Sequence, residues 1–121
     1  GLFLSLSAFA DNAAIVCEGG FEKVELRLDE ISDVSSDTAS IMRGEADRTI
    51  TTIKAEQTDY GILGIDVQQG TGPGKYTYQF KNLGSSECFG VYGSKQEGPA
   101  SVKVYNSMGM IIDTTCTCDV D

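Results

Sequence analysis

Apolar residues recur at every second position over much of this chain, and this alternation constrains its fold more than any other feature. In residues 23–29 (KVELRLD), Val24, Leu26 and Leu28 share one face and charged side chains take the other. A period of two is typical of a half-buried strand, whereas a helix repeats about every 3.6 residues. The same period occurs in residues 63–67, 75–81, 101–106 and 110–118, and more weakly in 14–18, 39–43, 48–56 and 88–93.

Short strands at this spacing predict the fold class. Fourteen glycines against two prolines supply turns between the alternating runs, and only residues 29–40 leave room for a short helix. The pattern indicates an all-β, single-domain antiparallel β-barrel or β-sandwich of about eight strands. In residues 63–67 it places Leu63, Ile65 and Val67 on one face.

The first ten residues (GLFLSLSAFA) resemble the end of an export signal. Their apolar run ends in Ala8-Phe9-Ala10, a small-x-small cleavage pattern, and polar Asp11 follows. The alternation in the same run also fits an edge strand. We interpret residues 1–10 as a signal-peptide remnant and residues 11–121 as a single all-β domain that is secreted or periplasmic. Apart from residues 1–10 no segment resembles a membrane span, so we expect no stable membrane insertion.

The chain has four cysteines, Cys17, Cys88, Cys116 and Cys118. In an exported small domain an even number predicts two disulfides. Cys116 and Cys118 point to the same face of one strand, and a bridge between them would close a strained ring. We therefore expect one of them to pair with Cys17 and the other with Cys88, in an order that the spacing does not fix.

Two other uses of this sulfur compete with structural disulfides. A strained Cys-x-Cys disulfide is a candidate redox centre. Met108 and Met110 precede the two cysteines and are soft ligands of the kind that copper(I) prefers. In an extended strand, however, Met110 and Cys116 lie about 20 Å apart. The sequence favours structural disulfides.

Charge and residue types exclude several functions. The net charge of −9 and the scattered lysines and arginines argue against nucleic acid, which an acidic surface repels. A cationic protein is an easier partner. The chain has no histidine, so it cannot hold a Ser-His-Asp or Cys-His arrangement or a histidine-ligated zinc. No catalytic constellation is recognisable, and we expect neither enzymatic activity nor a cofactor.

Two groups of residues are candidate sites. Acidic side chains gather at Asp29, Glu30, Asp33 and Asp37, where close carboxylates could hold calcium, although the glycine of an EF-hand loop is missing. Tyr76, Tyr78 and Phe80 form an aromatic stripe that would bind a ligand if it faced outward and would be core if it faced inward. Solvated loop charge and core packing are the simpler interpretations.

The sequence therefore predicts an exported, non-enzymatic binding or inhibitory module with an acidic surface. A small-ligand carrier barrel and a calcium- or copper-binding protein are the alternatives.

Overall fold

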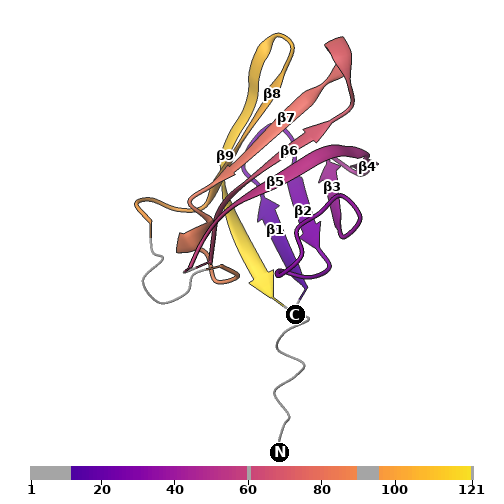
Figure 1. Cartoon of the computed structure of the whole chain (residues 1–121). Coiled ribbons are helices and arrows are strands. Elements are labelled where there is room, and N and C mark those ends of the chain that lie inside the picture. The colour runs from indigo at the N-terminus through magenta and orange to yellow at the C-terminus, as the bar shows by residue number, and fades with distance from the viewer. Residues whose placement is uncertain (1–11, 60, 90–95, 121) are drawn as a thin grey trace, which may run out of the picture.

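The computed structural model of the chain describes residues 12–59, 61–89 and 96–120, and within them it is an all-β protein (Figure 1). Its nine strands are β1 (Ala13–Cys17), β2 (Val24–Leu28), β3 (Ala39–Arg43), β4 (Ala46–Arg48), β5 (Ile50–Thr58), β6 (Gly61–Gln69), β7 (Tyr76–Lys81), β8 (Ser101–Asn106) and β9 (Gly109–Val120). The described residues contain no α-helix, and their only helical turns are 3₁₀ turns at Gly72–Gly74 and Leu83–Ser85. The predicted all-β fold class is confirmed. The proposed signal remnant lies outside the described residues.

The strands form a nearly closed antiparallel barrel. Their order is β4-β3-β2-β1-β9-β8-β7-β6-β5. Every pairing except that of β1 with β9 joins strands that follow one another in the chain. The chain therefore runs up and down around the barrel, and successive loops lie at alternate ends.

The barrel has two halves, one formed by β1–β4 and the other by β5–β8, and two segments pass from one half to the other. β9 pairs with β8 over residues 109–115 and with β1 over residues 116–120. β4 pairs with β3, whereas β5 begins after one intervening residue and pairs with β6. Strands that change sheets in this way form the corners of a barrel. As a result, β4 and β5 are the two ends of the strand order although Thr49 alone separates them in the chain.

The barrel interior is filled by side chains. Ile15, Leu26, Ile41, Val67 and Val102 come from five different strands, and each is at most 1% exposed. They belong to a single hydrophobic cluster that also includes Leu83 and Phe89 from the loop between β7 and β8. Alternation accounts for this arrangement, because each strand directs every second side chain inward.

Both predicted disulfides are present, and the structure assigns their pairing. Cys17 is bonded to Cys116 and Cys88 to Cys118. Cys17 and Cys116 stand opposite each other where β1 pairs with β9, with their Cα atoms 4.1 Å apart. Cys116 and Cys118 are both buried, as expected for two residues on one face of a strand. The second bridge attaches the β7–β8 loop to β9.

Two local predictions are wrong. Residues 29–40, which left room for a short helix, contain turns and the start of β3. Cys88 and Phe89 lie in a turn, so residues 88–93 do not begin a strand, and the rest of that run lies outside the described residues. Leu63 is only half-buried because an irregularity where Glu56 and Gln57 pair with β6 gives the inward position to Ile62.

No helix among the residues that the structure describes is long and apolar enough to cross a membrane.

Candidate functional site

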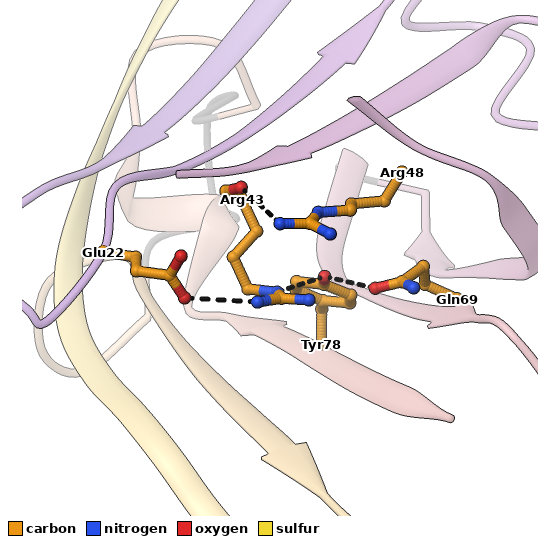
Figure 2. A network of polar contacts seen from close by, with 5 residues as sticks. All are labelled: Glu22, Arg43, Arg48, Gln69 and Tyr78. Carbon is orange, nitrogen blue, oxygen red and sulfur yellow. Dashed lines mark hydrogen bonds and ion pairs between the residues drawn. The ribbon is translucent and has the colours of Figure 1, made fainter. Parts of the chain in front are cut away.

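A charged side chain lies inside the barrel where β3 ends and β7 begins. Arg43 has the same alternation phase as Ile41 on β3, and this directs it inward, where it is 6% exposed. Its Nε donates a hydrogen bond of 3.1 Å to the hydroxyl of Tyr78, and its Nη1 donates one of 3.2 Å to Glu22 (Figure 2). A buried guanidinium needs such partners, since an unpaired buried charge is strongly unfavourable.

The contacts of Arg43 continue into a network that joins both halves of the barrel. The Tyr78 hydroxyl donates to Gln69 Oε1 over 2.9 Å, and the Arg43 guanidinium carbon lies 4.0 Å from the centre of the Tyr76 ring. Arg48 on β4 donates from Nη2 to the Arg43 carbonyl. We call these six residues, Glu22, Arg43, Arg48, Gln69, Tyr76 and Tyr78, the arginine network.

The pKa values of Arg43 and Tyr78 are both raised, which fixes the protonation states of these two residues near neutral pH. Burial raises the pKa of Tyr78 above its ordinary value, and Arg43 opposes that rise only in part. Burial alone would lower the pKa of Arg43, but its contacts with Tyr78 and Glu22 give a net increase. Tyr78 therefore stays neutral and Arg43 stays charged near neutral pH. Arg43 and Tyr78 therefore supply a fixed cross-link between β3 and β7.

A shallow groove lies on the outer surface of β5, β6 and β7. Its volume is about 340 Å³, and its walls carry Lys54, Glu56, Asp66 and Lys81. Gly64 lines the groove, and a Cβ there would lie 3.0 Å from the Phe80 carbonyl oxygen. The groove therefore presents side chains of both signs of charge to solvent.

The predicted calcium candidates lie in the loop between β2 and β3. Asp29, Glu30, Asp33 and Asp37 are all exposed. Within the part of the chain that the structure describes, no three His, Cys, Asp or Glu side chains are placed to hold a metal ion. The four acids therefore do not converge on a common point.

The aromatic stripe faces the barrel interior. Tyr78 and Phe80 are buried, and Tyr76 is half-buried under Arg43. The stripe thus belongs to the core, which is the simpler of the two interpretations that its sequence allows. Only the hydroxyl of Tyr78 has a polar role, as the link between Arg43 and Gln69.

Sequence reasoning missed the other members of the arginine network. One signal was available: in residues 39–43 (ASIMR) the alternation that buries Ile41 also buries Arg43. Nothing in the sequence places Glu22 or Gln69 beside it, since Glu22 comes from the β1–β2 loop and Gln69 from the end of β6.

Comparison of this chain with protein-family models, with curated proteins and with solved structures found no match. A function for this protein therefore has to be argued from its own residues.

Proposed function

We propose that this protein is an exported, non-enzymatic binding module whose acidic surface takes a cationic protein partner, for example a basic secreted enzyme that it inhibits. One observation carries the proposal. Apart from Glu22 and Glu25, every acidic side chain among the described residues is exposed, whereas Arg43 and Arg48 are withdrawn into the arginine network. Two acids and two bases are withdrawn in this way, so the surface keeps the acidic balance behind the net charge of −9.

The topology gathers part of this charge at one end of the barrel. In an up-and-down barrel the β2–β3, β5–β6 and β7–β8 loops share an end with the last residues of β9. Exposed acids in these segments are Asp29, Glu30, Asp33, Asp37, Asp59, Glu87, Glu97 and Asp119. We call this the acidic end. A potential of one sign over such a surface accelerates encounter with a partner of the opposite sign.

The disulfides support an exported location. Two bridges in a small domain are typical of secreted and periplasmic proteins, because the cytosol keeps thiols reduced. A secreted or periplasmic location is therefore part of the proposal.

The alternatives receive less support from the structure. A carrier needs space inside the barrel, but the inward positions of the described strands are occupied by packed side chains. A calcium or copper protein needs converging ligands, and Cys116 and Cys118 are already used in disulfides.

The test compares two variants with the same change in net charge. One neutralises four residues of the acidic end (Asp29→Asn, Glu30→Gln, Asp33→Asn and Asp37→Asn). The other neutralises four exposed acids elsewhere (Glu18→Gln, Glu45→Gln, Asp47→Asn and Asp113→Asn). Binding to a cationic protein, cytochrome c, and to its lysine-acetylated form is measured by calorimetry at several salt concentrations.

We expect the first variant to raise the dissociation constant about tenfold and the second to change it much less. Affinity should fall with added salt and should be lost with the acetylated probe. Equal effects of the two variants would show that net charge alone attracts the probe, and affinity that does not depend on salt would remove the electrostatic basis of the proposal.

A further inference from the structure

β5 ends the strand order and has a neighbour on one side only. Among the residues that the structure describes, it pairs with β6 alone. Among the described residues, no backbone hydrogen bond outside the strand ladders involves residues 52–57. In an antiparallel ladder alternate residues direct their N–H and C=O groups away from the neighbour. Along residues 52–57 the outer edge of β5 therefore offers donors and acceptors, the usual template for addition of another strand.

The core is incompletely covered along this edge. Ile50, Ile53 and Ala55 of β5 point toward the core but are only half-buried. Across the open side, the half-buried residues Ile31, Val34 and Ala39 belong to β3 and the loop before it. β3 pairs with β4 only along residues 41–43, so residues 39 and 40 have no partner in β4. Apolar surface and an unpaired backbone edge therefore occur together.

The charges on β5 are complementary to those of a second, antiparallel β5. Lys54 and Glu56 are exposed on the outer face, one on each side of Ala55. When two copies of β5 run antiparallel with Ala55 opposite Ala55, Lys54 of each copy stands opposite Glu56 of the other. The three ion pairs among the described residues join Lys23 and Arg27 to Glu25, and Arg43 to Glu22. Lys54 and Glu56 take part in none of these pairs.

We propose that β5 is a dimerisation edge, on which a second copy of this chain pairs through its own β5 about a two-fold axis at Ala55. Each copy then extends the sheet of the other, and two Lys54–Glu56 pairs fix the register. A self-complementary contact of this kind closes with two copies and leads to no further assembly. The same contact covers the half-buried Ile53 side chains.

The net charge of −9 makes two copies repel each other, but this repulsion acts over longer distances than the Lys54–Glu56 pairs do. At physiological ionic strength the screening length is about 8 Å, so charges on distant parts of the two barrels interact weakly. Opposite charges directly across a strand pair remain close enough to stabilise it, and like charges there destabilise it.

The test uses charge reversal and mixing. The mass of the full chain is measured by sedimentation equilibrium from micromolar to millimolar concentration. Lys54→Glu places glutamate against Glu56, and Glu56→Lys places lysine against Lys54, so each single variant should raise the dimer dissociation constant about tenfold. An equimolar mixture of the two single variants should form heterodimers, and the double exchange should restore the wild-type constant.

Lys103→Glu is the matched control, because it makes the same charge change at an exposed position of β8. It should leave the dimer constant unchanged, and far-ultraviolet circular dichroism checks that each variant keeps its fold. A wild-type chain that stays monomeric throughout the range would overturn the proposal. So would a dimer that ignores both single reversals, since it would use another face. If the chain formed no dimer and Lys54→Glu lost its binding to cytochrome c, the edge of β5 would belong to a partner protein. That result would also overturn the dimer proposal.

Discussion

Arg43 shows how one residue can fix the relation between the two halves of the barrel. It is buried on β3, and its partners come from β7 and from the β1–β2 loop. A charged side chain is an unfavourable choice for a core unless its donors are satisfied, and here the Tyr78 hydroxyl is the buried acceptor of its Nε. The cost of disrupting the pair therefore depends on which partner is removed.

Replacing Tyr78 with phenylalanine removes the hydroxyl and leaves Arg43 Nε without an acceptor inside the barrel. We expect Tyr78→Phe to lower the free energy of unfolding by about 1–3 kcal/mol. Tyr105→Phe makes the same chemical change at a half-buried tyrosine whose hydroxyl has no hydrogen bond to another described residue. This variant should have little effect on stability. Urea denaturation measures both. Equal losses in the two variants would contradict a role for the hydroxyl in the network.

The same hydroxyl gives a pH dependence with a definite sign. Burial raises the pKa of Tyr78 in the folded protein above the ordinary value of 10.0, against the smaller opposing effect of Arg43. The unfolded chain then loses its proton first as the pH rises, so this contribution is complete below pH 10 and is lost above it. The stability difference between the wild type and Tyr78→Phe should narrow as the pH rises beyond that value. A constant or growing difference would contradict the raised pKa.

At the scale of the strands, the alternation predicted that a strand exists better than it predicted where that strand begins and ends. The runs in 23–29, 75–81, 101–106 and 110–118 all correspond to strands of the barrel. Residues 48–56 read as one strand, but the structure interrupts the strand at Thr49, because β4 and β5 pair with different neighbours. Such a corner depends on partners far away in the sequence, and local periodicity carries no information about them.

The candidate site was less predictable than the fold for the same reason. The inward direction of Tyr78 and Phe80 follows from local alternation. The contact of Arg43 with Glu22 and Tyr78 depends on how loops and strands meet in three dimensions. The acidic end likewise depends on topology, since its residues come from separate loops.

The turn between β3 and β4 links one strand boundary to the arginine network. Gly44 has φ +69°, and a Cβ at this position would lie 2.8 Å from Glu22 Oε2. Its N–H also donates to the Lys23 carbonyl, which holds the β1–β2 loop against the turn. A side chain here would therefore strain the backbone and displace a carboxylate that Arg43 needs.

We expect Gly44→Ala to lower the free energy of unfolding by more than the roughly 1–2 kcal/mol that a left-handed alanine costs. Gly72→Ala is its control, because Gly72 has φ +60° and nothing lies within 4 Å of its added Cβ. Thermal denaturation of the two variants compares them directly. If Gly72→Ala were as destabilising as Gly44→Ala, backbone strain alone would explain both and the contact with Glu22 would be irrelevant.

For the whole molecule, the two disulfides constrain the chain over very different lengths. Cys17 and Cys116 are 99 residues apart, so their bond joins the first described strand to the last, where β1 pairs with β9. Cys88 and Cys118 are 30 residues apart and attach one long loop. A cross-link stabilises mainly by restricting the unfolded chain, and the restriction grows with the length of the loop that it closes.

This difference predicts an order of stability. Replacing Cys17 and Cys116 with alanine should lower the free energy of unfolding by about 4–5 kcal/mol, and replacing Cys88 and Cys118 by about 3–4 kcal/mol. The first change also empties buried positions on two paired strands, since Cys17 and Cys116 both lie in the core, whereas Cys88 is only half-buried. Both effects act in the same direction, so denaturant unfolding of the two double variants should rank them without ambiguity. The reverse order would mean that the β7–β8 loop, with Leu83 and Phe89 packed into the core, holds the barrel together more firmly than the covalent closure of β1 on β9.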